Sequence, residues 1–232
     1  MSFPYKHVLL IGATSGIGKA MADHFITQGI AVTAVGRRQE RLDAFLTLRS
    51  AFNAHPTIDC VFLNAGTQSQ ALFNHPESVD LATFNREVTI NFTAQVALVH
   101  AVLPHLLNRT GRSGLIFTGT PVTIVPAFPA PAYCASKAAL EAFLICLREQ
   151  LRDTNVKVQH ISPGPVQTEF HPQFGMPLKD FSEETWTGLA AGDADIYPGC
   201  VGGSTKEQWL ELVKVRDAAV ARMTGLLRKV MG

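Results

Sequence analysis

Tyr133 and Lys137 stand four residues apart in this chain of 232 residues, and their side chains are suited to proton transfer. Side chains at positions i and i+4 lie on one face of a helix, so both can point toward the same reacting group. A tyrosine hydroxyl has a pKa of about 10, and a neighbouring ammonium group lowers it by stabilising the phenolate. The pair therefore predicts a general acid and base, Tyr133, assisted by the cation of Lys137. Because such pairs also arise by accident in helices, the prediction depends on the motifs that accompany it.

A glycine-rich turn follows the apolar run Val8-Leu9-Leu10-Ile11 and precedes a stretch with helical periodicity. Such a turn lets backbone N–H groups approach a pyrophosphate, which the positive end of the helix dipole then holds. Gly12 suits the tight turn, Gly16 the close approach to the ligand, and Gly18 the close contact between helix and strand. The turn predicts a dinucleotide site with contacts from Gly12, Thr14, Ser15, Gly16, Ile17 and Gly18. Glycines that merely end a strand are the alternative.

Three residues separate the first two glycines of this turn, and Asn64-Ala65-Gly66 follows a later apolar run. Together with Tyr133 and Lys137, these motifs resemble the short-chain dehydrogenase/reductase family over most of residues 5–170. The resemblance implies a nicotinamide cofactor beside the tyrosine, with Asn64, Ala65 and Gly66 near the adenosine ribose and Lys137 on the nicotinamide ribose. It also implies hydride transfer between nicotinamide C4 and the carbonyl carbon of a small ketone or secondary alcohol, without a metal.

Two further residues match the family's catalytic positions. Thr120 lies 13 residues before Tyr133, where the family has a serine that holds the substrate carbonyl. Threonine keeps the hydroxyl, but its methyl group restricts χ1 and narrows the pocket, so we expect an altered substrate range or rate. Asn91 matches the asparagine that completes the family's catalytic tetrad and holds a water in its proton relay. A strand end at Thr120 and a helix cap at Asn91 are the simpler alternatives.

Two more segments bear on the cofactor. Ser162-Pro163-Gly164-Pro165-Val166-Gln167-Thr168 matches the family's Pro-Gly turn, which implies that Pro163, Gly164, the Val166 backbone and the Thr168 hydroxyl fix the nicotinamide carboxamide. Arg37 and Arg38 stand where an NAD-preferring site would place an acid for the ribose 2′-hydroxyl. Two arginines that open a helix oppose its dipole, whereas a 2′-phosphate would explain them. We therefore predict NADP(H) rather than NAD(H), with a solvated basic pair as the alternative.

Strand and helix signals alternate along the chain. Apolar runs at 7–11, 30–35, 58–63, 114–119 and 156–161 are separated by longer stretches of helical period, the first from Gly16 to just before Gly29. This alternation predicts an α/β fold, a three-layer doubly wound parallel sheet of Rossmann type, in a single domain over 1–232. Helices at 93–108 and 133–152 are predicted to form the interface of a homodimer or homotetramer.

The interval 36–57 departs from the family's pattern. The family fits a helix, an edge strand and a second helix into this interval, and two crossovers of at least ~10 residues plus a strand do not fit into 22 residues. We predict one helix here, with its apolar face formed by Leu42, Phe45, Leu46 and Phe52, on the sheet face opposite the first helix. The sheet would then lack one edge strand and the adenine pocket one wall. A non-catalytic, dinucleotide-responsive protein or an inactive shortened variant is therefore the alternative to an enzyme.

Two later stretches are rich in large apolar residues. Residues 169–190 hold Phe170, Phe174, Met176, Leu178, Phe181 and Trp186 among prolines and acids. They predict either a lid over a lipophilic substrate or an irregular segment anchored by its aromatic side chains. From Thr205 onward, apolar residues recur at helical spacing to Val230, which favours a helix that covers the domain.

Composition excludes several function classes. A formal charge of +1, from 20 basic and 19 acidic residues without runs, gives no electrostatic footprint for nucleic acid or an anionic membrane. No apolar stretch approaches the ~18 residues of a membrane span, so we expect a cytoplasmic protein. The four cysteines show no Cys-x-x-Cys pair and no zinc spacing with histidine. A small-molecule substrate suits this chain, and the aromatic residues named above favour an apolar one.

Overall fold

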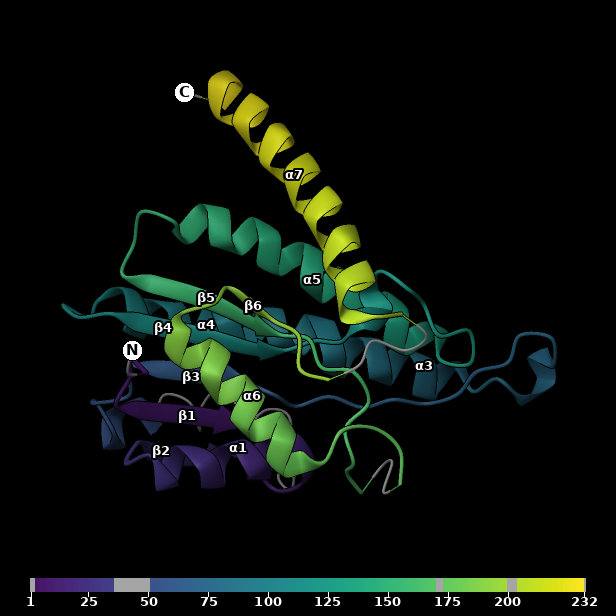
Figure 1. Cartoon of the computed structure of the whole chain (residues 1–232), viewed down its shortest axis with the longest axis horizontal. Helices are drawn as coiled ribbons and strands as arrows, with labels where there is room; N and C mark the ends of the chain where they lie inside the picture. The colour runs from purple at the N-terminus through teal and green to yellow at the C-terminus, as the bar shows by residue number, and fades with distance from the viewer. Residues whose placement is uncertain (1–2, 36–50, 170–172, 200–203, 232) are drawn as a thin grey trace.

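The computed structural model describes residues 3–35, 51–169, 173–199 and 204–231. Its centre is a sheet of six parallel strands in the order β2-β1-β3-β4-β5-β6, with helices on both faces (Figure 1). The strands are β1 (His7–Ile11), β2 (Ala31–Val35), β3 (Cys60–Leu63), β4 (Ser113–Thr118), β5 (Val156–Ile161) and β6 (Asp195–Ile196). The predicted doubly wound α/β fold is therefore confirmed.

The central strands are buried because helices cover both of their faces. Every residue of β3 and β4 is buried, which explains why these strands read as continuous apolar runs rather than alternating ones. The five predicted strands lie within two residues of their observed bounds. Sequence reasoning missed β6, since two residues are too few to show a periodicity.

Helices α1 (Gly16–Thr27) and α6 (Leu178–Ala191) cover one face of the sheet, and α4 (Ala94–Leu107) and α5 (Pro131–Leu151) cover the other. Each pair closes its own apolar core, the first around Phe25 and Phe181 and the second around Val102 and Leu144. Other helices of the described residues are η1 (Pro76–Ser78), α3 (Leu81–Val88), the π-helical η2 (Thr89–Thr93), η3 (Pro121–Thr123) and α7 (Lys206–Met231).

The interval 36–57 is described only from residue 51 onward. Residues 51–54 are helical, and Phe52 packs on the α4 and α5 side, with its ring stacked 4.1 Å from the ring of His105. Residues 51–54 therefore lie on the face opposite α1, where the helix of this interval was predicted. Leu42, Phe45 and Leu46 lie outside the described residues. Within the described part of the chain, β2 pairs with β1 alone.

The segment 169–190 is more regular than predicted, because its second half is helix α6. Phe181 is fully buried, and the Trp186 ring lies 5.2 Å from the ring of Phe3 in the core under α1. Phe174 is 66% exposed. The aromatic side chains of α6 are therefore anchors, as one of the two interpretations expected, but they anchor a helix and not an irregular segment.

The expectation that the C-terminal helix covers the body is wrong for most of its length. Trp209 and Val213 are buried, whereas the later apolar residues of α7 are exposed. The expectation that no apolar stretch reaches membrane-spanning length also needs correction. The π-helical turn η2 joins α3 to α4, and the resulting 27-residue helix, Leu81–Leu107, passes that test by length and composition alone. Core helices of soluble proteins pass the same test, so this result is weak evidence for a membrane span.

Candidate active site

The glycine turn after β1 has no room for a side chain at two positions. Gly12 has a φ of +90°, which L side chains rarely adopt, and a Cβ there would lie 2.8 Å from the Ala65 backbone nitrogen. A Cβ on Gly18 would lie 2.0 Å from the Gly12 carbonyl oxygen. The turn is therefore packed tightly against both α1 and the segment that follows β3.

The first turn of α1 offers backbone N–H groups to a ligand. Ser15 precedes the helix, and in this described stretch its side chain makes no capping hydrogen bond and the first helical turn has no acid. Gly16 has a φ of +52°, and a Cβ there would be 3.4 Å from Cγ2 of Thr168. Thr14 and Ile17 lie in the same turn. Uncapped N–H groups at the positive end of a helix fit an anion such as a pyrophosphate.

Asn64 connects the glycine turn to strand β4. Its Nδ2 donates to the Gly12 carbonyl oxygen at 2.9 Å, and its Oδ1 accepts from the Thr118 hydroxyl at 2.8 Å. The next residue, Ala65, is held by Gln95, whose Nε2 donates to the Ala65 carbonyl oxygen at 2.7 Å. Asn64 thus uses both ends of its amide within the protein, which fixes the glycine turn relative to β3 and β4.

Lys137 lies buried next to Tyr133 on α5. The Lys137 Nζ donates to the Thr118 carbonyl oxygen at 2.8 Å and lies 5.8 Å from the centre of the Tyr133 ring. The side chain of Lys137 is 4% exposed, and this burial lowers its pKa to about 8. A low dielectric disfavours the ammonium form, so the pKa falls.

Tyr133 is hydrogen-bonded through its side chain to Thr120, which ends the loop after β4. Burial raises the pKa of Tyr133 to about 12, although the Thr120 hydrogen bond lowers it. Among the smaller effects, the negative charge of Glu87 raises it further. The expectation that Lys137 brings the tyrosine pKa below 10 is not met in the chain alone, because burial outweighs the other influences. Tyr133 is therefore protonated at neutral pH.

Asn91 lies in the π-helical turn η2 and is fully buried. Its Oδ1 accepts from the Thr67 backbone N–H at 2.9 Å, and its Nδ2 donates to the Thr67 carbonyl oxygen and to Oγ of Ser136. A Cβ on Gly66 would lie 3.4 Å from Asn91 Oδ1 and 3.6 Å from Lys137 Nζ. Asn91, Gly66 and Lys137 therefore meet at one place, between η2 and α5. A π-helical turn widens the helix locally and is frequent at functional sites.

The segment after β5 closes the same end of the sheet. The Gly164 backbone N–H donates to the Pro198 carbonyl oxygen at 3.0 Å, next to Pro163. Val166 is buried and pairs with Met176 in an isolated bridge, which places Thr168 against Gly16. Because parallel strands present their carboxyl ends at one edge, residues from the ends of β1, β3, β4 and β5 come together there.

The remaining predicted site residues, Arg37 and Arg38, lie outside the described residues. Sequence reasoning missed Thr118, Gln95, Ser136 and Glu87. Gln95 follows Asn91 by four residues and Ser136 follows Tyr133 by three, so helical spacing could have indicated both. Thr118 ends a strand two residues before Thr120. Glu87 is 1% exposed, with Oε2 accepting from the Ser69 hydroxyl, and a buried carboxyl is not visible in a sequence.

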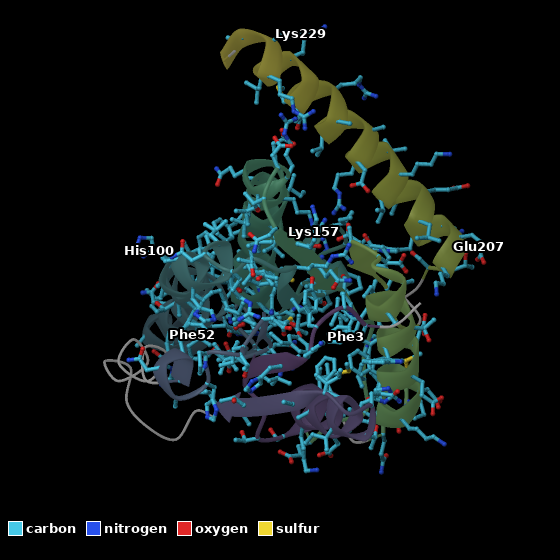
Figure 2. All side chains as sticks on the ribbon, turned by 90° about the vertical axis from the view of Figure 1, so that its left-hand side faces the viewer. Phe3, Phe52, His100, Lys157, Glu207 and Lys229 are labelled. Carbon is cyan, nitrogen blue, oxygen red and sulfur yellow. The ribbon has the colours of Figure 1, made fainter. Side chains whose placement is uncertain are left out.

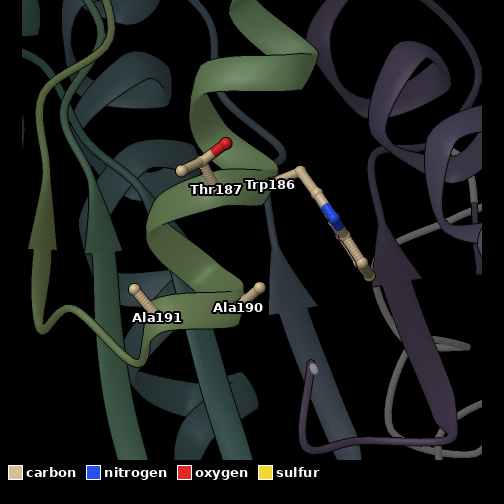
Figure 3. Close-up of a pocket in the computed structure, with 4 residues that line it drawn as sticks. All are labelled: Trp186, Thr187, Ala190 and Ala191. Atoms are coloured by element: carbon tan, nitrogen blue, oxygen red, sulfur yellow. The ribbon is translucent and has the colours of Figure 1, made fainter. Parts of the chain in front are cut away.

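A hollow elsewhere on the surface is lined by Trp186, Thr187, Ala190 and Ala191 of α6 (Figure 3). None of these four side chains is an acid, a base or a thiol. The hollow therefore lacks the groups that the glycine turn and Tyr133 bring together.

A profile of the short chain dehydrogenase family matches residues 6–54 and 46–176. This chain belongs to the short-chain dehydrogenase family. The two matched stretches overlap at 46–54, inside the interval 36–57. Similar curated proteins include sulfoacetaldehyde reductase 2 of Chromohalobacter salexigens, 32% identical over 188 residues, and serine 3-dehydrogenase of Rhizobium radiobacter, 32% identical over 186 residues. Each match covers 70% of this chain and 73% of the relative.

Solved structures share the fold at low sequence identity. The bulky-bulky ketone specific alcohol dehydrogenase from Comamonas testosteroni is 19% identical, with a TM-score of 0.76 over 95% of both chains. The 3-ketoacyl-(acyl-carrier-protein) reductase of Brucella melitensis, solved with NADH, is 18% identical, with a TM-score of 0.75 over 87% of this chain and 99% of its own. The chain is thus an oxidoreductase of the short-chain dehydrogenase type by family and by fold.

Proposed function

We propose that this protein is an NADP(H)-dependent oxidoreductase that transfers a hydride between nicotinamide C4 and the carbonyl carbon of a small apolar ketone, or in reverse from a secondary alcohol. The observation that carries the proposal is the Tyr133 side chain, hydrogen-bonded to Thr120 beside the buried Lys137. This group lies at the same edge of the sheet as the glycine turn, with which it shares Thr118 and Asn64 as connecting residues.

The residues present fit a nicotinamide dinucleotide. The uncapped start of α1 suits the pyrophosphate, and the segment Asn64-Ala65-Gly66 suits the adenosine ribose. Lys137 would bind the nicotinamide ribose, and Pro163, Gly164, Val166 and Thr168 would hold the carboxamide. When bound, the cofactor supplies or accepts the hydride.

The protein's own part in the reduction is to move one proton. As the carbonyl carbon gains a hydride, its oxygen takes up the electron pair of the C=O bond and becomes a strong base. The Tyr133 hydroxyl donates its proton to that oxygen, and Thr120 orients the carbonyl by a hydrogen bond. Lys137 stabilises the phenolate that remains until water returns the proton, and Asn91 holds the backbone of Thr67, next to Gly66, in place beside it. A tyrosine pKa of about 12 keeps the hydroxyl protonated at neutral pH, which is the form that donates to the substrate oxygen.

The loops around the site support an apolar substrate. Phe73, Phe128 and Phe174 are 57%, 86% and 66% exposed, and they come from the loops that follow β3, β4 and β5. The Ala71 backbone N–H donates to the Pro129 carbonyl oxygen at 3.0 Å, so the first two loops are joined. Exposed aromatic side chains on the loops that follow the strands suit an apolar ligand at this edge of the sheet.

The choice of NADP(H) rests on Arg37 and Arg38, which stand where an NAD site would have an acid. We further propose that residues 1–232 form one domain, that the protein acts in the cytoplasm, and that 93–108 and 133–152 form a homodimer or homotetramer interface. Neither nucleic acid nor a membrane is a proposed partner.

The decisive variant is Tyr133→Phe, which removes one oxygen. NADPH should raise the melting temperature of both the wild type and the variant, while NADPH oxidation with a panel of alkyl and aryl ketones should fall at least ~10³-fold in the variant. Tyr5→Phe is the matched control, because Tyr5 is buried at the opposite end of the sheet, against Gly114. Retained turnover in Tyr133→Phe would refute the proposed role of Tyr133. A folded wild type that binds NADPH but reduces no ketone would favour the non-catalytic alternative.

A further inference from the structure

His160 is a buried titratable side chain of strand β5 that the proposed reaction does not use. Lys157, labelled in Figure 2, is exposed near the start of β5, and His160, three residues further along, is 2% exposed. Strand β5 pairs with β4 and with β6, where the partners of His160 are Phe117 and Asp195. A polar ring in this position needs partners, since an unpaired buried donor or acceptor costs folding free energy.

One end of the His160 ring is held by an ion pair. Its Nδ1 lies 3.3 Å from Oδ1 of Asp195, and the Asp195 carboxylate accepts hydrogen bonds of 2.8 and 3.0 Å from Arg148 of α5. Burial raises the pKa of Asp195, but the hydrogen bonds from His160 and Arg148 outweigh it and hold this pKa far below its ordinary value. An ionised carboxylate only accepts hydrogen bonds, so Nδ1 of His160 is the donor and the Asp195 contact fixes the orientation of the ring.

The other end of the His160 ring fills the space beside Gly119, the residue before Thr120. A Cβ on Gly119 would lie 1.8 Å from Nε2 and 2.7 Å from Cε1 of this ring. The φ of Gly119 is not in the positive range that favours glycine, so the backbone alone would accept an alanine here. The position is therefore restricted to glycine by the ring of His160.

We propose that His160 is a positioning residue for catalysis. Its ring sets the place of Gly119 and thereby the direction in which Thr120 presents its hydroxyl to the substrate carbonyl. The inference rests on the proposed function, in which Thr120 orients that carbonyl. Gly119 is also held through its backbone, because its N–H donates to the Ile161 carbonyl oxygen at 2.7 Å. The hydrogen bond ties Gly119 to β5, and the ring limits its movement toward β5.

The same side chains connect Thr120 to the helix that carries Tyr133. Arg148 and Tyr133 both belong to α5, and Tyr133 is hydrogen-bonded to Thr120. Arg148, Asp195 and His160 therefore form a path of polar contacts from α5 through β6 and β5 to the loop after β4. Thr120 and Tyr133 must meet the same carbonyl oxygen, and a misplacement of about 1 Å can lower a rate by up to ~100-fold.

His160→Asn tests this role. Asparagine keeps an N–H for Asp195 but lacks Nε2 and Cε1, the atoms beside Gly119. We expect kcat for ketone reduction to fall about tenfold, while the melting-temperature shift produced by NADPH stays the same. An unchanged kcat would overturn the proposal.

Tyr5→Leu is the matched control for this variant. A Cβ on Gly114, in the first half of β4, would lie 2.4 Å from the Tyr5 ring, so the control also removes the end of a ring from beside a glycine near the same strand. It lowers the melting temperature but should leave kcat unchanged within about twofold. An equal fall of kcat in Tyr5→Leu and His160→Asn would overturn the proposal, because it would show a general effect of core packing.

Gly119→Ala tests the contact itself. In the wild type the added methyl group meets the ring, so kcat should fall at least ~10-fold. In the His160→Ala background the methyl group has room, and the same change should alter kcat by less than about twofold. A Gly119→Ala protein that folds only together with His160→Ala would show the same coupling. An equal loss of kcat in both backgrounds would show that the ring does not set the place of Gly119.

NMR of threonine methyl groups reports on Thr120 without turnover. Its signal is the one that is absent in Thr120→Ser, and it should move in His160→Asn but not in Tyr5→Leu. A wild type that binds NADPH but reduces no ketone would refute the proposed function, and the methyl signal would then decide the role of His160. A Thr120 signal at the same position in the wild type and in His160→Asn would exclude positioning by His160.

Discussion

The buried Lys137 should lower the free energy of unfolding of the protein. Its pKa falls from 10.5 to about 8 because the side chain is buried. One pKa unit corresponds to about 1.4 kcal/mol, so the charged form costs the folded state roughly 3 kcal/mol at pH 7. The hydrogen bond from Nζ to the Thr118 carbonyl oxygen offsets about 1.5–3 kcal/mol of this cost. Lys137→Met, which keeps the length and removes the charge, should therefore abolish turnover and raise the free energy of unfolding at pH 7 by about 1 kcal/mol.

The sign of the pH dependence follows from the direction of the shift. A lysine pKa that is lower in the folded state gives a cost that is fully present below pH 8 and disappears as the pH rises through 10.5. The free energy of unfolding of Lys137→Met relative to the wild type should thus fall by about 2–3 kcal/mol between pH 7 and pH 10, so that the variant changes from slightly more stable to less stable than the wild type. Because both proteins share every other titrating group, their difference isolates this one.

Urea unfolding of the cofactor-free protein, followed by far-UV circular dichroism at the two pH values, measures this difference. Lys157→Met is the matched control, since Lys157 is exposed on β5 and its loss should change stability by less than about 0.5 kcal/mol at either pH. A Lys137→Met variant that is destabilised equally at pH 7 and pH 10 would refute the reasoning, because it would show that burial imposes no cost on the ammonium group.

Three further variants probe the geometry of the site. Gly18→Ala should lower the melting temperature by more than 5 °C and abolish the NADPH-induced shift, since its Cβ would lie 2.0 Å from a carbonyl oxygen of the glycine turn; normal cofactor binding would contradict this. Thr118→Val removes the hydroxyl that donates to Asn64 at 2.8 Å and should cost about 1 kcal/mol in urea unfolding together with several-fold weaker NADPH binding. An unchanged cofactor affinity would show that the Asn64 side chain does not support the cofactor site. In Glu87→Gln, burial still raises the pKa of Tyr133 but the added effect of the carboxylate is lost, so the alkaline limb of the pH–rate profile should move to lower pH; no movement, or one to higher pH, would contradict the charge effect.

The parts of the fold that the sequence predicts are those with a strong periodicity. The apolar runs that became β3 and β4 and the long helical stretch around Tyr133 were placed within two residues. The short strand β6 and helix α6 were missed for different reasons. A two-residue strand is too short to show a periodic pattern. The prolines before Leu178 favoured an irregular segment over helix α6, whose buried positions begin with Phe181.

The candidate site likewise has residues that the sequence predicts and residues that it does not. Motifs with fixed spacing, such as the glycine turn and Tyr133 with Lys137, lie together at one edge of the sheet as the order of elements requires. The residues that support them, Thr118 and Glu87, depend on three-dimensional contacts between distant segments and carry no local signal. The exposed apolar residues of α7 could not be distinguished from a core-facing stripe, since both have the same helical spacing and differ only in what lies against them.

Hydride transfer itself can be followed with NADPH that carries deuterium at both hydrogen positions of nicotinamide C4. The wild type, incubated with the ketone that gives the fastest NADPH oxidation, should yield an alcohol with one deuterium on the former carbonyl carbon, and Tyr133→Phe should yield almost none. An alcohol that contains no deuterium, or equal deuterium transfer by the wild type and Tyr133→Phe, would contradict the account of this site.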